Sequence, residues 1–148
     1  MERGYAAIAV QREDFIERMI RQLAEALARI AGRTANGKLE EALAESARAW
    51  TDLLDVPRDL IERLDGPTLA QLLADPMKLR IAGELLAAEA RVHQAKGNPV
   101  HALLCNKRAF ELFLEARALD PAPRDEAAIL ELSRLIPKTE IDPRYRTD

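Results

Sequence analysis

The sequence predicts an all-α protein, on three observations. Ala, Leu, Arg and Glu dominate the 148 residues, and only 4% are aromatic, a composition that favours helix over sheet. Apolar residues recur at steps of three and four over long stretches, as they do on one face of a helix. No stretch alternates apolar and polar residues for long enough to predict a strand.

The first helix is predicted from Asp14, as its N-cap, to a stop at Gly32 or at Asn36-Gly37. Residues 1–13 are then an N-terminal extension. The seam that predicts this helix consists of Ile16, Ile20, Leu23, Leu27 and Ile30.

A second apolar stripe, from Leu39 to Leu54, completes a first hairpin over about 14–55. Residues 57–74 are expected to hold two short linker helices. Pro57 starts the first of them, and Gly66 and Pro67 end it.

Asp75 as N-cap, with Pro76 in the first turn, opens a second hairpin over about 76–119. Gly97-Asn98-Pro99 separates its two helices. A last helix is expected over 124–135 and a flexible tail over 137–148. The chain is thus one helical domain, 14–136, of about seven helices.

The stretch from Gly32 to Lys38 has the spacing of a phosphate-binding loop. In such a loop Ser or Thr follows the lysine, whereas here Leu39 follows Lys38. A strand should also precede the loop, and a helix is predicted instead. We therefore interpret this stretch as a tight turn between two helices.

An internal repeat explains this turn better than a phosphate-binding loop does. At an offset of 60 residues one glycine, two alanines and an aromatic residue recur, which indicates two copies of a glycine-closed helical hairpin. Glycine allows the left-handed conformation, alanine lets the helices approach closely, and the aromatic ring covers the groove. The matched pairs are Gly37 and Gly97, Ala42 and Ala102, Ala49 and Ala109, and Trp50 and Phe110.

These hairpins resemble tetratricopeptide repeats, in which Gly, Ala and Ala occupy the same offsets. The segments "DFIERMIRQLAEALARI" and "GNPVHALLCNKRAFELFLEA" resemble an uncharacterised bacterial family of small tetratricopeptide-like helical proteins. The resemblance covers about 14–119. It implies a tetratricopeptide-like fold and does not indicate any chemical activity.

Three residues are candidates for a metal site: His93, His101 and Cys105. His101 and Cys105 are four residues apart on one predicted helix, as are Glu89 and His93 on the preceding one, so both pairs would have to meet across the hairpin. A buried cysteine beside partly exposed histidines is the simpler interpretation. We predict no metal, no cofactor and no catalytic residue.

Net charge, cysteine content and hydropathy argue against several other classes of protein. The net charge of −3 gives no general attraction for nucleic acid. The lone Cys105 cannot form an internal disulfide, and the apolar run over 6–10 is too short for a signal peptide or a membrane span. We expect a cytoplasmic protein that binds neither nucleic acid nor membrane.

The predicted helix over 100–119 is apolar on two faces, and both must be covered. The linker and C-terminal helices would cover them within the chain, or a homodimer would do so. The predicted function is a non-catalytic protein–protein interaction or scaffold module. The alternative is a helical bundle that binds a small ligand or metal between the hairpins, near His93, His101 and Cys105.

Overall fold

The computed structural model describes the backbone of residues 2–146 and the side chains of residues 7–146. Within this range the chain is all-α, as predicted, and contains no strand. Two short 3-10 helices, η1 (Lys138–Glu140) and η2 (Pro143–Tyr145), follow the α-helices. The α-helices are α1 (Glu2–Ala35), α2 (Leu39–Leu54), α3 (Arg58–Ile61), α4 (Gly66–Leu73), α5 (Pro76–Ala95), α6 (Pro99–Leu119) and α7 (Pro123–Leu135).

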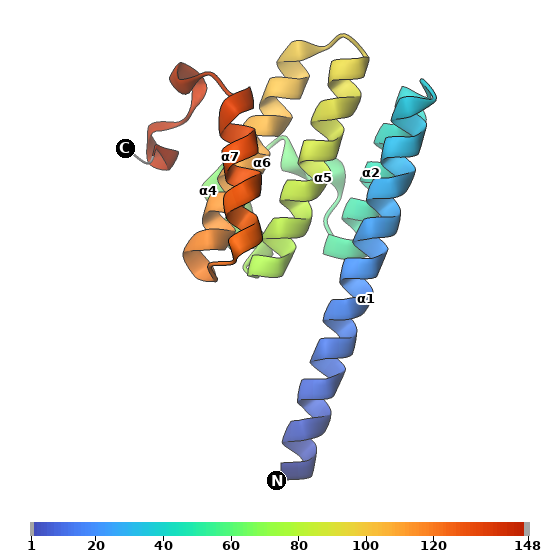
Figure 1. Ribbon diagram of the computed structural model, residues 1–148, viewed down its shortest axis with the longest axis vertical. Helices are drawn as coiled ribbons and strands as arrows, with labels where there is room; N and C mark the ends of the chain where they lie inside the picture. The colour runs from blue at the N-terminus through green and yellow to red at the C-terminus, as the bar shows by residue number, and fades with distance from the viewer. Residues whose placement is uncertain (1, 147–148) are drawn as a thin grey trace.

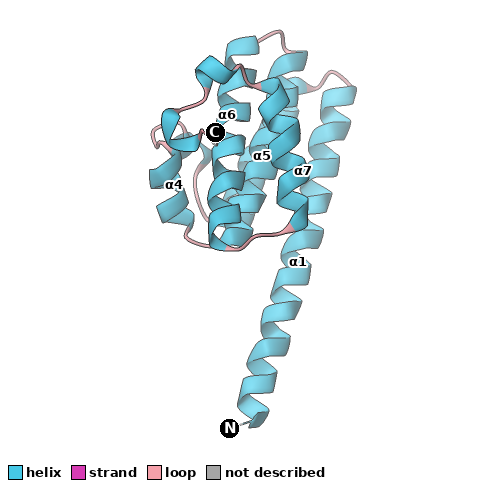
Figure 2. Ribbon diagram, turned by 60° about the vertical axis from the view of Figure 1, so that its left-hand side comes forward, coloured by secondary structure: helices cyan, strands magenta, loops and turns pink. Residues whose placement is uncertain are grey.

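Two antiparallel hairpins, α1–α2 and α5–α6, lie side by side (Figure 1). Helix α2 packs against α5, and α7 packs against α6. The short helix α4 contacts α5 and α6 on the side away from α7. The chain therefore forms a helical layer with α5 at its centre (Figures 1 and 2).

Both hairpin turns contain a glycine in the left-handed conformation that the sequence predicted. Gly37 and Gly97 adopt left-handed conformations, with φ of 73° and 78°. Gly32, by contrast, lies inside α1, so the stretch that resembles a phosphate-binding loop is helical as far as Ala35. The other positions of the predicted repeat, Ala42, Ala49, Trp50, Ala102, Ala109 and Phe110, are all buried.

Helix α1 is longer than the sequence indicated. It begins at Glu2, so Asp14 lies within the helix and residues 2–13 extend it; Met1 lies outside the described residues. Residues 5–13 contain neither Gly nor Pro, so nothing local interrupts the helix before Asp14. The N-terminal half of this helix projects beyond the other helices (Figure 1).

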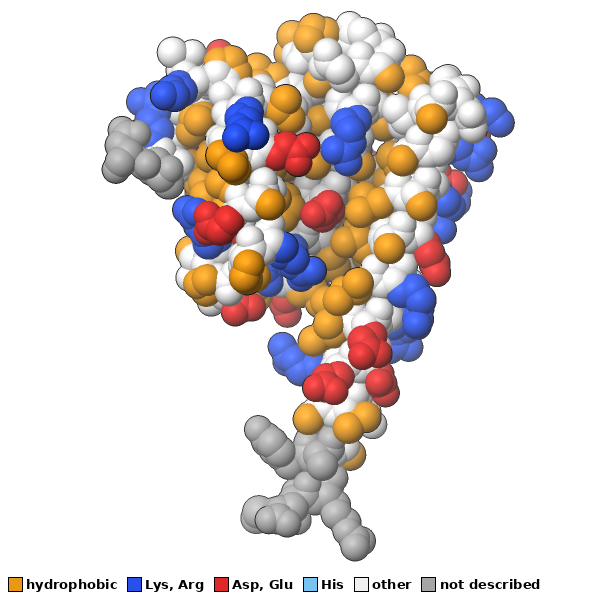
Figure 3. Space-filling view, viewed as in Figure 1, with side chains coloured by type: hydrophobic (Ala, Val, Ile, Leu, Met, Phe, Trp, Pro, Cys, Tyr) orange, Lys and Arg blue, Asp and Glu red, His pale blue; other side chains and the backbone are white. Residues whose placement is uncertain are grey.

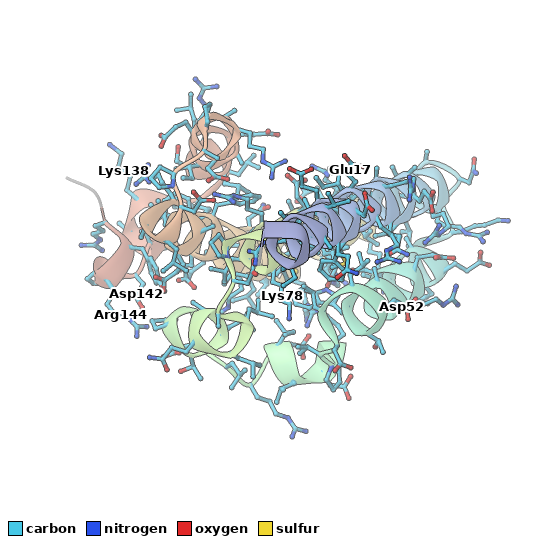
Figure 4. All side chains as sticks on the ribbon, turned by 90° about the horizontal axis from the view of Figure 1, so that it is seen from below. Glu17, Asp52, Lys78, Lys138, Asp142 and Arg144 are labelled. Carbon is cyan, nitrogen blue, oxygen red and sulfur yellow. The ribbon has the colours of Figure 1, made fainter. Side chains whose placement is uncertain are left out.

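The segment after α7 also differs from the flexible tail that the sequence indicated. Tyr145 is buried, and its hydroxyl donates a hydrogen bond to Glu115 (3.1 Å). Arg144 pairs with Asp142 (2.7 Å) and reaches Asp65 at the start of α4 (3.4 Å). Figure 4 shows Asp142 and Arg144 beside that helix. One aromatic anchor and these ion pairs hold residues 138–146 against the domain. Thr147 and Asp148 lie outside the described residues.

Aspartate side chains cap the N-termini of α4, in the linker, and of α5, in the second hairpin. The Asp75 carboxylate accepts from the Met77 amide, so the predicted N-cap is correct. Gly66 and Pro67, expected to end a helix, instead begin α4, because the Asp65 carboxylate caps it by accepting from the Thr68 amide.

Both apolar faces of α6 are covered within the chain. Leu112, Phe113 and Ala116 are buried, and α4, α5 and α7 supply the cover. Leu119, at the end of the helix, is 60% exposed. The observation that led to the homodimer hypothesis is therefore explained by packing inside one chain.

Two buried carboxylates tie the helices together. Glu89 of α5 accepts hydrogen bonds from Ser46 (2.6 Å), Trp50 (2.9 Å) and Arg58 (2.8 Å). Asp125 of α7, which is fully buried, forms a two-pronged pair with Arg80 of α5 (2.9 and 2.9 Å). Arg80 also donates to the backbone carbonyl of Asp120. Because buried charges are costly unless paired, these contacts fix the positions of α2, α3 and α7 on α5.

Substitution of alanine for two glycines within helices should change the stability of the protein in opposite directions. A Cβ on Gly83 would lie 2.7 Å from the buried Phe113 ring, whereas one on Gly32 meets nothing within 4 Å. We expect Gly83→Ala to lower the free energy of unfolding by about 1–2 kcal/mol and Gly32→Ala to raise it by about 0.5–1 kcal/mol. Denaturant unfolding measures both. A stabilised Gly83→Ala would contradict this packing.

Glu89→Ala should lower the free energy of unfolding by about 3–5 kcal/mol, because it leaves the Arg58 charge and two buried donors without their acceptor. Glu89→Gln retains one acceptor oxygen and should cost less. The fluorescence of Trp50, the only tryptophan, reports the transition in guanidinium. Exposed Glu25→Ala is the control, expected within about 0.5 kcal/mol of the parent. A similarly small effect of Glu89→Ala would refute the role of this carboxylate.

Candidate functional site

A hollow surface runs along α5 between α1 and α7, and we call it the α5 groove. Three hollows of about 390, 110 and 240 Å³ make it up. The first shares Glu84 and Phe113 with the second, and Arg91 with the third. Hydrophobic side chains gather in this groove (Figure 3). They include Ile20, Leu23 and Leu27 of α1, Ala87 and Ala88 of α5, and Ala128, Leu132 and Leu135 of α7.

The α5 groove contains four charged side chains that are not paired with other described side chains. Glu84, Arg91, Arg124 and Glu131 line it, and none makes a hydrogen bond or ion pair with another described side chain. Burial raises the pKa of Glu84 above its usual value, while Arg91 and Arg124 oppose this rise. A partly desolvated carboxylate is thus available at the centre of an apolar groove.

A smaller pocket of about 230 Å³ lies among α3, α5 and α6, on the other side of the α5–α6 hairpin. We call it the histidine pocket. It brings together two imidazoles, two guanidinium groups and a thiol with an aliphatic wall. Its lining residues are Arg58, Ile61, Glu62, Leu86, His93, His101, Leu104, Cys105 and Arg108.

The two histidines stack across the hairpin. Their ring centroids lie 5.2 Å apart with an interplanar angle of 27°. The Nδ1 atom of His93 is buried and has no hydrogen-bond partner among the described residues. Burial, together with His101, lowers the pKa of His93, so its neutral form is favoured at neutral pH.

Cys105 lines the same pocket. It is buried, and this burial raises the pKa of its thiol to about 12, so the thiolate that binds metals or attacks substrates is suppressed. The Glu89 carboxylate is occupied by Ser46, Trp50 and Arg58. Over the described residues, no three His, Cys, Asp or Glu side chains form a group that could hold a metal ion.

The two arginines of the histidine pocket are only partly paired. Arg58 donates through Nε to Glu89, while its Nη1 is buried without a hydrogen-bond partner and lies 3.7 Å from Glu62. Arg108 donates through Nη1 to Glu111 (2.9 Å). The pocket therefore presents hydrogen-bond donors beside an aliphatic wall.

The structure places His93, His101 and Cys105 around one pocket, where the sequence hypothesis located a ligand site. Arg58 and Arg108 were missed, because nothing in their neighbourhood in the sequence distinguishes them from other surface arginines. The importance of Glu89 could have been recognised from the sequence, because this charged residue interrupts the apolar run Ala87-Ala88-Glu89-Ala90 of a buried helix. The lining of the α5 groove was also missed, since it depends on the arrangement of three helices.

Comparison with known proteins gives one partial likeness. Over 82 residues the chain is 37% identical to the coenzyme PQQ synthesis protein F of Pseudomonas aeruginosa. The match covers 55% of this chain and 11% of that protein, so the chain spans about a tenth of its length. No protein-family model and no solved structure matches the chain significantly. None of the described helices combines the length and apolar character needed to cross a membrane.

The lowered pKa of His93 predicts how stability depends on pH. Below its ordinary pKa of about 6.5 the unfolded chain binds a proton that the folded chain excludes. Stability should therefore fall as the pH decreases from about 7 to 5. Lys96 and Arg58 near the ring reinforce this effect, and Glu89 opposes it.

Glu84 and Glu111 act in the opposite direction, because burial raises their pKa and the folded chain binds their protons more readily. The readout is therefore the difference between the parent and His93→Gln, measured by denaturant unfolding at pH 7, 6 and 5. We expect the advantage of the parent over the variant to shrink at each step. A constant difference would contradict the lowered pKa.

Proposed function

We propose that the chain is a non-catalytic protein-interaction module that binds a helix of a partner protein in the α5 groove. The observation that carries the proposal is the apolar groove, with unpaired charges at its centre and edges. Soluble proteins rarely leave such surfaces uncovered unless they bind something.

The groove suits a helix in shape. Its floor contains small side chains, Ala87, Ala88 and Ala90, which allow the backbone of another helix to approach closely. Helix α5 has 20 residues and is about 30 Å long, so it matches a partner helix of several turns. The largest hollow, about 390 Å³, has room for the apolar side chains that such a helix presents at three- and four-residue spacing.

The charges define the chemistry of the partner. Glu84 is partly desolvated and lacks a bonded cation, so a Lys or Arg on the apolar face of the partner helix would pair with it. The projecting half of α1 offers further apolar surface next to the groove, since Ile8, Phe15 and Ile20 are 66%, 47% and 45% exposed.

The partial likeness concerns a segment of a much longer protein. A link to coenzyme PQQ synthesis rests on the name of that protein alone, and nothing in the groove bears on it. The tetratricopeptide-like character, the internal repeat and the cytoplasmic location remain part of the proposal.

Site-specific photo-crosslinking in the cells that make the protein tests this function. A benzophenone amino acid at Ala87 lies in the groove, whereas one at Asp52 lies on α2, away from α7 (Figure 4). We expect one polypeptide to be captured from position 87 and not from position 52. Mass spectrometry should map the crosslink to an amphipathic helix that carries Lys or Arg. In the background of Glu84→Arg the yield should fall at least about fivefold, because like charges would meet.

The matched background is Glu25→Arg, an equivalent charge reversal at an exposed site of α1 that lines none of the three hollows. It should leave the crosslink unchanged. Capture of a second copy of the chain from Ala87 would instead support the homodimer, which light scattering would show as twice 16.5 kDa. Equal capture from both positions, or none from Ala87, would refute binding in the groove.

A further inference from the structure

We infer that the histidine pocket is a second, separate binding site, and that it takes a small organic monocarboxylate with an aliphatic body. The pocket lies across the α5–α6 hairpin from the α5 groove, so the inference does not depend on the proposed protein partner. Its support comes from unsatisfied donors, local charge and an apolar wall.

The donors indicate that the ligand brings acceptor oxygens. Arg58 Nη1 is buried and makes no hydrogen bond to a described residue, although Nε of the same guanidinium is bonded to Glu89. Its only described partner is Glu62, in an ion pair at 3.7 Å that is too long for a hydrogen bond. A ligand oxygen would give this buried donor the hydrogen bond that it lacks. Arg108 bonds Glu111 through Nη1, and its other guanidinium donors make no hydrogen bond to another described residue. Guanidinium groups match the planar geometry of a carboxylate.

His93 adds a third polar contact. Apart from Arg58 Nη1, the Nδ1 atom of His93 is the one buried side-chain nitrogen or oxygen of the described residues without a hydrogen bond, and its ring lines the same pocket. The stack with His101 fixes the orientation of the ring. Two buried nitrogen atoms that make no hydrogen bond to a described residue therefore belong to residues of one pocket.

The local charge favours a monoanion over a phosphate dianion. Each arginine is already partly balanced, Arg58 by Glu89 and Arg108 by Glu111. Glu62 adds a further negative charge at the rim. Because three glutamates already oppose the two arginines, each negative charge on a ligand adds repulsion, and a monoanion meets less of it than a dianion.

The remaining wall is aliphatic and accommodates a hydrocarbon chain. Ile61 and Leu86 are buried, and Leu104, which is 55% exposed, forms the outer edge. The volume of about 230 Å³ is below the usual range for drug-sized ligands, about 300–1,000 Å³, and suits a small metabolite.

The probe is hexanoate, titrated into the ¹⁵N-labelled full-length protein and followed by NMR. We expect saturable shifts at Leu104, Cys105, the His93 ring and the Arg58 Nε–H group. 1-Hexanol, which lacks the charge, should bind at least tenfold more weakly, and inorganic phosphate should not produce the same shifts. Non-saturating shifts, equal binding of hexanol, or stronger binding of phosphate would overturn the inference.

A matched pair of variants tests the charge without disturbing the core. Leu104→Glu places a carboxylate at the mouth of the pocket, whereas Leu104→Gln has nearly the same shape and no charge. Hexanoate should bind Leu104→Glu about fivefold or more weakly than Leu104→Gln. Leu130→Glu, at an exposed position of α7 that is not part of the pocket, should match the parent. Equal affinities of the two Leu104 variants would contradict carboxylate binding there.

Discussion

The buried carboxylate of Glu89 joins three helices of the fold. One side chain of α5 accepts hydrogen bonds from two residues of α2 and from Arg58 of α3. A carboxylate in a dry interior is tolerated only when its oxygens are satisfied, so the three helices must meet within hydrogen-bond distance. Helix α3 has only four residues and cannot be stable by itself. Its position, and with it one wall of the histidine pocket, therefore depends on this contact.

A second buried pair fixes the opposite side of the molecule. Arg80 and Asp125 join α5 to the start of α7, and the contact of Arg80 with the Asp120 carbonyl holds the connection before it. Helix α7 thereby becomes a fixed wall of the α5 groove. Both surfaces of interest are thus built on α5 and held by buried ion pairs. Rigid supports of this kind preorganise a binding site before a ligand arrives.

The two surfaces differ in what they leave unsatisfied. The α5 groove offers extended apolar area together with four charged side chains that lack a described partner, which suits a large complementary surface such as an amphipathic helix. The histidine pocket offers buried polar atoms without partners in a small volume, which suits a small molecule. The two hypotheses raised by the sequence, a protein-interaction module and a ligand-binding bundle, therefore concern different faces of one fold. One does not exclude the other.

The all-α class, the hairpin turns at Gly37 and Gly97, and the cap at Asp75 could be predicted from the sequence, because each of these depends on residues close together in the chain. Which polar groups meet could be seen only in the folded chain. Glu89 bonds residues 43, 39 and 31 positions away, and Arg80 pairs with Asp125 at 45 positions. The folded chain also shows that Tyr145 anchors the C-terminal segment. Pairs at such separations leave no periodic pattern, since their energy arises from burial that exists only once the helices have packed.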